Sequence, residues 1–88
     1  YLDSSVAKYH YYYGLVLSKL GRFKEAGRAI QRALEIEPSN ADYMAELGHI
    51  YLQLGFKLRA KSTFEKAIRF DPSNEKAVSG LQRIRDHS

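Results

Sequence analysis

Residues 41–74, ADYMAELGHIYLQLGFKLRAKSTFEKAIRFDPSN, repeat the pattern of the 34 residues that precede them. Shifting residues 7–40 by 34 places aligns small, turn-forming and capping residues in both copies. The identical pairs are Ala7/Ala41, Tyr9/Tyr43, Gly14/Gly48, Leu20/Leu54, Gly21/Gly55, Ala26/Ala60, Ala33/Ala67, Pro38/Pro72, Ser39/Ser73 and Asn40/Asn74. A fixed period of this length predicts a chain built from stacked copies of one supersecondary unit.

Each copy is predicted to form a pair of helices. Apolar side chains of the second copy, such as Tyr43, Leu47 and Ile50, follow the period of a helix. Gly21 and Gly55 end the first helix of each copy, because glycine leaves the right-handed helical conformation at little cost. The predicted helices span about 7–20, 23–36, 41–54 and 57–70. Two helices joined by a short turn form an antiparallel hairpin, so we expect an all-α stack of hairpins.

Small and polar residues at fixed places predict how the helices begin and pack. Asn40 and Asn74, or the serines before them, stand where the next helix needs an N-cap. Gly14 and Gly48 on the first helices allow a neighbouring helix to approach closely. We assign these glycines a packing role rather than a catalytic one.

Residues 1–6 are interpreted as the tail of a truncated preceding repeat. By the repeat register, Tyr9 and Tyr13 should pack between helices. The missing helix would have covered the face that carries Tyr9, Tyr13 and Val16, so an apolar edge that can self-associate is expected there.

Residues 75–88 begin a third copy and are interpreted as a C-terminal capping helix with one apolar face. Gln82 stands where both full copies have glycine, which suggests that no helix packs closely at that point. We expect the natural end of the chain to lie close to Ser88.

The pattern resembles the tetratricopeptide repeat, whose signature places Gly, Tyr, Ala, Phe, Ala and Pro at set positions within 34 residues. The second copy carries Leu47, Gly48, Tyr51, Ala60, Phe64, Ala67 and Pro72. The first copy carries Tyr13, Gly14, Leu17, Ala26, Ile30, Ala33 and Pro38. The family's early Trp position holds His10 and Met44. The resemblance implies a right-handed superhelical stack of antiparallel hairpins, an α-solenoid of about five helices, with repeats at 7–40 and 41–74.

In this family, partner peptides lie along the concave surface formed by the first helix of each repeat. Carried over by position, the predicted partner-binding residues are Lys8, Tyr11, Tyr12, Leu15, Lys19, Asp42, Glu46, His49, Gln53, Lys76 and Arg83. The resemblance therefore implies a protein–protein interaction module, part of a larger protein, that binds a peptide or helix. Tyr11, Tyr12 and Leu15 would supply apolar contact area. An acidic or mixed-charge partner segment would face Lys8 and Lys19.

Family members that bind the acidic tails of heat-shock chaperones hold a terminal carboxylate with lysine, asparagine and arginine. At the matching positions this chain has Tyr11, Leu15, Glu46, Lys76 and Gly80. Only Lys76 agrees with that requirement, so binding by a carboxylate clamp is not expected.

The sequence offers little for catalysis. The absence of cysteine excludes disulfides, thiol nucleophiles and cysteine-ligated zinc. Glu46 and His49 have the spacing of carboxylate-bridged metal sites, but no second such motif accompanies them. We therefore predict no enzymatic activity, no metal site and no cofactor.

Two alternatives stay open at this point: an RNA-binding helical repeat, and a structural or self-association spacer of a multidomain protein. The net charge of +4 permits an acidic partner, but the basic residues form no block. Asp42 and Glu46 on the predicted inner face argue against nucleic acid. No apolar stretch approaches the roughly 18 residues of a membrane span. The composition fixes no compartment, and the cytoplasm is the default expectation.

Overall fold

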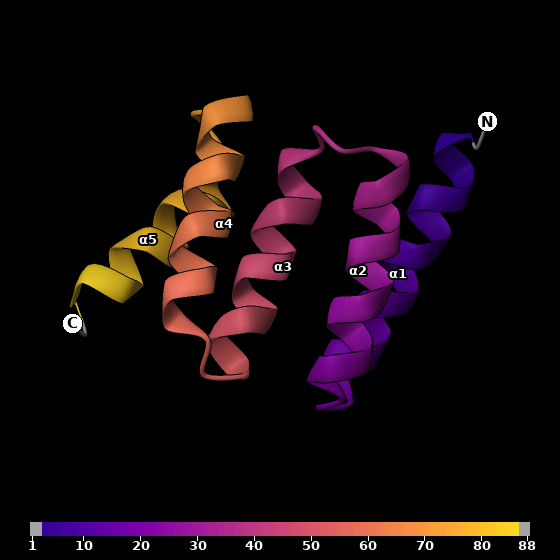
Figure 1. Cartoon of the computed structure of the whole chain (residues 1–88), viewed down its shortest axis with the longest axis horizontal. Helices are drawn as coiled ribbons and strands as arrows, with labels where there is room; N and C mark the ends of the chain where they lie inside the picture. Colours follow the sequence, from indigo (N-terminus) through magenta and orange to yellow (C-terminus); the bar gives the residue numbers. More distant parts are fainter. Residues whose placement is uncertain (1–2, 87–88) are drawn as a thin grey trace.

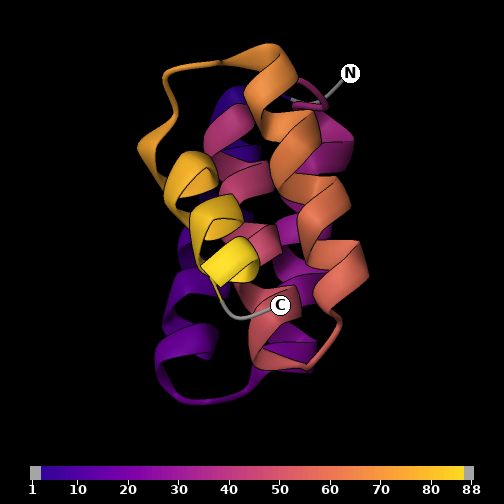
Figure 2. The ribbon, with the colours of Figure 1, turned by 90° about the vertical axis from the view of Figure 1, so that its left-hand side faces the viewer.

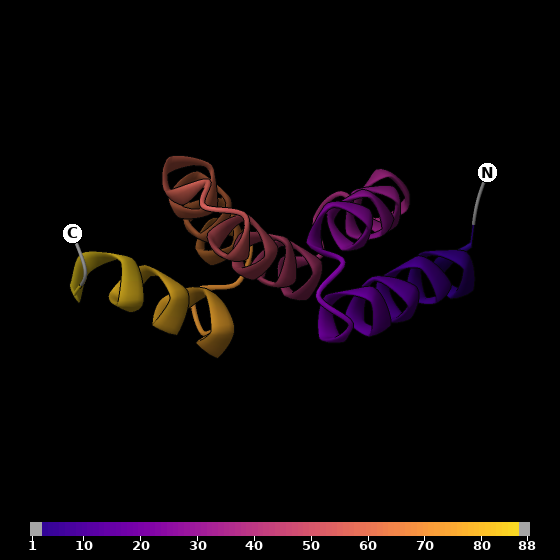
Figure 3. The ribbon, with the colours of Figure 1, turned by 90° about the horizontal axis from the view of Figure 1, so that it is seen from below.

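The computed structural model describes residues 3–86, which form five α-helices and no strand. The helices are α1 (Ser4–Lys19), α2 (Phe23–Ile36), α3 (Ala41–Gln53), α4 (Lys57–Phe70) and α5 (Glu75–Asp86). α1 and α2 form one antiparallel hairpin, α3 and α4 form the next, and α5 packs against α3 and α4 (Figure 1). Seen from below, α1, α3 and α5 lie on one side and α2 and α4 on the other (Figure 3). The expected right-handed all-α solenoid is confirmed.

The first helix begins earlier than predicted, at Ser4 instead of about residue 7. The Asp3 carboxylate is its N-cap and accepts hydrogen bonds from the backbone N–H groups of Ser5, at 2.9 Å, and Val6, at 3.3 Å. The hydroxyl of Ser5 also donates to this carboxylate and lowers the pKa of Asp3. Residues 4–6 thus belong to the first hairpin. The preceding repeat stays a prediction, and residues 1 and 2 lie outside the described part of the chain.

Turns and caps follow the sequence prediction. Gly21 and Gly55 have φ values of +80° and +83°, a left-handed conformation that favours glycine. The Asn40 side-chain oxygen accepts from the backbone N–H of Tyr43 at 3.0 Å, and the Asn74 oxygen accepts from that of Ala77 at 3.0 Å. These contacts set where α3 and α5 begin.

The core consists of two clusters, and each lies between one hairpin and the helix that follows it. Leu17, Ile30 and Ile50 lie in the first, where α1, α2 and α3 meet. Met44 and Phe64 lie in the second, where α3, α4 and α5 meet. α3 contributes to both clusters, so it couples the two repeats. Figure 2, viewed from the end of the stack that carries α5, shows that helix lying alongside α4.

Phe64 is a fully buried ring that three helices enclose. A Cβ atom added to Gly48 of α3 would lie 2.5 Å from Cε1 of Phe64, which confirms the predicted close approach. A Cβ added to Gly80 of α5 would lie 2.3 Å from Cζ of the same ring. Gln82 is exposed, as expected, yet α5 does pack closely on α4, through a glycine two residues earlier.

The expectation that Tyr9 and Tyr13 are core residues is wrong for this chain. Their side chains are 67% and 50% exposed, and their rings stack on each other with centroids 6.3 Å apart. Val16 is 55% exposed on the same helix. Among residues 3–86 no further helix covers α1, and the apolar edge anticipated from the sequence is present there. None of the described helices is long and apolar enough to cross a membrane.

Candidate functional site

The surface formed by α1, α3 and α5, called the inner surface below, has an aromatic group at one end. Tyr11 of α1 stacks on Tyr43 of α3 with ring centroids 4.6 Å apart. Tyr12 meets Tyr11 edge-on at 5.4 Å and is 59% exposed. Burial raises the pKa of Tyr11, and burial together with the neighbouring Glu37 raises the pKa of Tyr43 to about 12. Both stacked phenols are therefore neutral at physiological pH, beside an exposed ring that is free for contact.

Polar bonds from α3 to α5 fix the centre of the inner surface. The Lys76 ammonium lies 3.2 Å from a carboxylate oxygen of Glu46. The side-chain amide of Asn74 donates to Asp42 at 2.7 Å. Burial opposes the charged form of Lys76, but the hydrogen bond and charge of Glu46 outweigh it and raise the pKa of Lys76. The two acidic groups are thus held in place by residues of the last helix and its cap.

His49 lies between this charged centre and the core. Its half-buried ring meets Phe64 edge-on, with centroids 5.3 Å apart. Burial lowers the pKa of His49, Glu46 opposes that shift, and the charges of Arg83 and Lys76 add to it. The geometry thus favours a neutral imidazole.

The structure brings together many of the residues predicted to bind a partner. Seven of them are linked by ring contacts, polar bonds or charge: Tyr11, Tyr12, Asp42, Glu46, His49, Lys76 and Arg83. Gln53 lines a cavity of about 240 Å³ together with Arg83, at the far end of the inner surface. Lys8, Leu15 and Lys19 lie on α1 and take no part in these contacts; the first and last are exposed and Leu15 is half-buried.

Two residues that stabilise this surface were not singled out as site residues from the sequence. The ring of Tyr43 stacks on that of Tyr11. The side-chain amide of Asn74 donates a hydrogen bond to Asp42, in addition to the bond by which Asn74 caps α5. An asparagine at a cap position is visible in the sequence, but its second bond depends on how α3 and α5 cross. In the sequence, Tyr43 lies on an apolar stripe of its helix. Such a stripe gives no sign that the ring stacks on a tyrosine of another helix.

Two features of the structure agree with the expectation that this chain does not bind a partner by a carboxylate clamp. At the position of the clamp arginine, Gly80 lies so close to Phe64 that even a Cβ atom would clash. At the position of an asparagine, Glu46 presents a negative charge that would repel a carboxylate. The one matching residue, Lys76, is already paired with Glu46.

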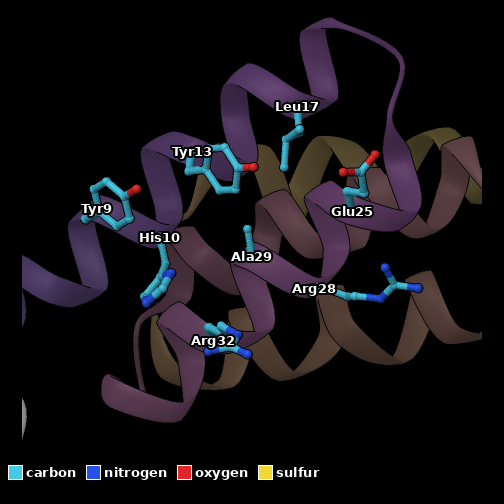
Figure 4. Close-up of a pocket in the computed structure, with 8 residues that line it drawn as sticks. All are labelled: Tyr9, His10, Tyr13, Leu17, Glu25, Arg28, Ala29 and Arg32. Carbon is cyan, nitrogen blue, oxygen red and sulfur yellow. The ribbon is translucent and has the colours of Figure 1, made fainter.

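A cavity of about 470 Å³ lies away from the inner surface, at the exposed edge between α1 and α2 (Figure 4). It is lined by Tyr9, His10, Tyr13, Leu17, Glu25, Arg28, Ala29 and Arg32. We call this surface the N-terminal edge. Within residues 3–86, no three histidine or carboxylate side chains gather closely enough to hold a metal ion.

Comparison with known proteins is consistent with this architecture. Protein CTR9 homolog of Arabidopsis thaliana is 38% identical over 75 residues, covering 83% of this chain and 7% of that protein. The Hsp70–Hsp90 organizing protein of Triticum aestivum is 32% identical over 65 residues, covering 74% of this chain and 11% of that protein. The chain thus spans only a small part of these relatives.

Solved structures and family models agree on the fold. The second TPR of Spaghetti (RPAP3), bound to the HSP90 peptide SRMEEVD, superposes with a TM-score of 0.89 at 23% identity, covering 96% of this chain and 78% of that one. Two models of the tetratricopeptide repeat match residues 7–40 and 41–74, the two ranges that the internal period aligns. This chain belongs to the tetratricopeptide repeat family.

Proposed function

We propose that this chain is a protein–protein interaction module, and that its inner surface holds a peptide or helix of a partner protein. The observation that carries the proposal is the exposed Tyr12 ring beside the Tyr11–Tyr43 stack. Rigid aromatic side chains bury much area at little entropic cost and commonly anchor interfaces. Family membership and a similar fold that binds an HSP90 peptide support a protein as the partner. Binding, rather than catalysis, is the role typical of this family.

The side chains of the inner surface define the kind of segment it would take. An apolar or aromatic residue would pack on Tyr12 and the half-buried Leu15. Acidic residues would face the exposed Lys8 and Lys19, which flank the aromatic group on the same helix. A free C-terminal carboxylate on the partner would be unfavourable at the centre of the inner surface, because the Glu46 carboxylate would repel it.

The test is a selection of peptides from a random library on the immobilised chain, followed by fluorescence anisotropy with the selected peptide. Tyr12→Ala should weaken binding by about tenfold or more, since it removes an anchoring ring. Tyr13→Ala is the matched control, because it removes the same side chain one residue away on a different face of α1. It should leave the affinity within about twofold. The peptide SRMEEVD should bind more weakly than the selected peptide.

Two results would contradict the proposal. Equal losses from Tyr12→Ala and Tyr13→Ala would show that binding does not depend on the inner surface in particular. Circular dichroism of both variants would show whether general destabilisation explains the losses. A selected peptide that ignores Tyr12→Ala and His49→Ala would place binding off the inner surface.

The N-terminal edge supports a second role, self-association. Tyr9, Tyr13 and Val16 expose apolar area on one helix, and isologous pairing of two copies would bury it twice. The chain would then also act as a structural element of a larger protein.

A further inference from the structure

Charge is separated along the helix axes of this chain. Both glycine turns, which follow α1 and α3, lie at one end of the hairpins, and both proline loops lie at the other (Figure 1, Figure 2). Residues 19–25 and 53–59, called the glycine-turn end below, contain five cations and one acid. Residues 35–42 and 69–76, at the opposite end, contain five acids and two cations. The glycine-turn end is therefore the positive pole of the molecule.

The cations of the glycine-turn end differ in what they contact. Within residues 3–86, no carboxylate pairs with Lys19 or Lys24, and both side chains are exposed. The Arg59 guanidinium lies 5.2 Å from the centroid of the Phe56 ring, a neutral group that does not cancel its charge. The single acid of this end lies 3.6 Å from Arg22, and an ion pair this exposed contributes little. Three cations from two turns are thus open to an anionic partner.

Large apolar side chains are exposed among these cations. Leu20 is 66% exposed, Phe56 45% and Leu58 83%, and none of the three belongs to either core cluster. Leu54 of α3 lines a cavity of about 280 Å³ together with the first glycine turn, so the two turns adjoin each other. Exposed apolar groups flanked by lysine and arginine are typical of surfaces that bind at the membrane interface.

The shape of the glycine-turn end favours a flat occupant over a peptide or a helix. A cavity of about 420 Å³ at the second turn is lined by the consecutive residues 55–59. The cavity at the first turn is lined by residues 21–25, and Leu54 is its one residue from another helix. A partner helix binds in a groove between two walls. Neither cavity has a second wall that could hold one.

We infer that the glycine-turn end binds an anionic lipid surface, in addition to the protein-binding role proposed above. Leu20 and Leu58 would enter the headgroup layer, and Lys19, Lys24 and Arg59 would face the lipid phosphates and carboxylates. Figure 3 looks onto this end and shows α1, α3 and α5 along one side of it. The inner surface would therefore stay open to a partner while the chain lies on a membrane.

The test is flotation of the whole chain with vesicles of phosphatidylcholine, either pure or with about one-third phosphatidylserine. The chain should float with the anionic vesicles and not with the neutral ones, and its affinity should fall as salt is raised. Tyr12→Ala should bind vesicles as the wild type does. Failure of the lipid site and failure of the inner surface are thereby told apart.

Charge at the glycine-turn end is tested by a pair of variants. Lys24→Glu should weaken binding about tenfold, since it reverses one charge at the lipid surface. Lys66→Glu is the matched control, because it makes the same change in net charge about 14 Å along α4 from the start of that helix. That distance exceeds the roughly 8 Å over which exposed charges act at physiological salt. The control should change the affinity by less than about twofold.

Apolar contact is tested by a second pair. Leu58→Ser should weaken binding about fivefold to tenfold, because an exposed leucine no longer enters the headgroup layer. Val78→Ser removes an apolar side chain that is 47% exposed in the first turn of α5, at the opposite end, and should leave the affinity unchanged. Circular dichroism of all variants checks that their helical content is kept.

A fluorescent label locates the contact. The chain has no cysteine, so Leu58→Cys and Val78→Cys each create a single labelling site. A nitrobenzoxadiazole label at position 58 should brighten and shift to the blue with anionic vesicles, and one at position 78 should not. The inference is overturned if Lys24→Glu and Lys66→Glu weaken binding equally, because net charge alone would then suffice. It is also overturned if Leu58→Ser binds like the wild type, or if polyglutamate or single-stranded RNA binds as tightly with the same dependence on Leu58.

Discussion

Phe64 shows at the residue scale how glycine positions this fold. The ring is fully buried, and Gly48 and Gly80 approach it from two different helices. In the preceding interface the residues 34 places earlier are Ile30 and Glu46. At the first interface, the smaller Ile30 side chain is thus paired by register with Glu46. At the second interface, the larger Phe64 ring is paired with Gly80, which has no side chain.

Gly80→Ala should destabilise the chain although alanine is the better helix former. Overpacking against a fully buried ring costs about 1–3 kcal/mol, and the higher helix propensity of alanine offsets up to about 1 kcal/mol of this loss. We expect a net loss of about 1–2 kcal/mol in urea unfolding. Gly27→Ala is the control, because the nearest atom to its new Cβ, Cγ2 of Ile50, is 3.6 Å away. That variant should gain about 0.5–1 kcal/mol. Equal effects of the two substitutions would show that the ring does not limit α5.

The pH dependence of stability should carry a contribution from His49. Its pKa in the folded chain lies below the ordinary value of 6.5, so the unfolded chain binds the proton more tightly. The contribution of His49 to the free energy of unfolding is fully present above pH 6.5. It is lost as the pH falls through the pKa that His49 has in the folded chain. The melting temperature should drop between pH 7.5 and pH 5.5, and it should drop less in His49→Gln. Parallel pH profiles of the two proteins would rule the effect out.

Single residues differ in how far the sequence alone predicts them. Gly14 and Gly48 were predicted correctly because the repeat marks them twice. Gly80 occurs once, at a position where the other copies have Tyr12 and Glu46, and its role depends on the size of a ring in another helix. Sequence periodicity identifies residues that recur in every copy. It cannot identify a residue, such as Gly80, whose close contact occurs at one interface only.

At the scale of whole helices, capping decides the boundaries. Asp3 lies in register with Glu37, so the repeat predicts the end of a helix there, yet its carboxylate caps the start of α1. The start of α1 is therefore set by the hydrogen bonds of the Asp3 carboxylate and differs from the start that the repeat register predicts. The starts of α3 and α5 were predictable because Asn40 and Asn74 recur directly before an apolar stripe.

Asn74→Ala should cost more stability than Asn40→Ala. Both remove a cap worth about 1 kcal/mol, but only the former also releases Asp42 of α3. We expect losses of about 2 kcal/mol and about 1 kcal/mol respectively. A double-mutant cycle of Asn74→Ala with Asp42→Ala should show a coupling energy of about 1 kcal/mol in urea unfolding. A coupling near zero would mean that the bond contributes nothing.

At the scale of the whole molecule, the layers and the edges follow from the repeat. Stacking hairpins puts first helices on one side, so most of the predicted partner-binding residues come together on the inner surface. The sequence could not reveal how polar bonds between α3 and α5 tie up Glu46 and Lys76, because residues 30 positions apart share no local pattern.

The exposed N-terminal edge should make the isolated chain associate weakly. Sedimentation at rising concentration should show a monomer–dimer equilibrium that Tyr13→Lys shifts by about tenfold toward monomer, since it places a charge in the apolar contact. Tyr12→Lys should leave the equilibrium unchanged. A wild-type chain that stays monomeric at millimolar concentration would contradict this role of the edge.

The enclosure of one ring by α3, α4 and α5 bears on how such arrays can be rearranged. If α5 were joined directly behind the first hairpin, it would meet the smaller Ile30 side chain in place of the Phe64 ring, and Gly80 would face a void. α5 is therefore matched to the second hairpin and is not interchangeable between repeats. Engineers who lengthen or shorten the array would have to move the second hairpin and α5 as a single cassette.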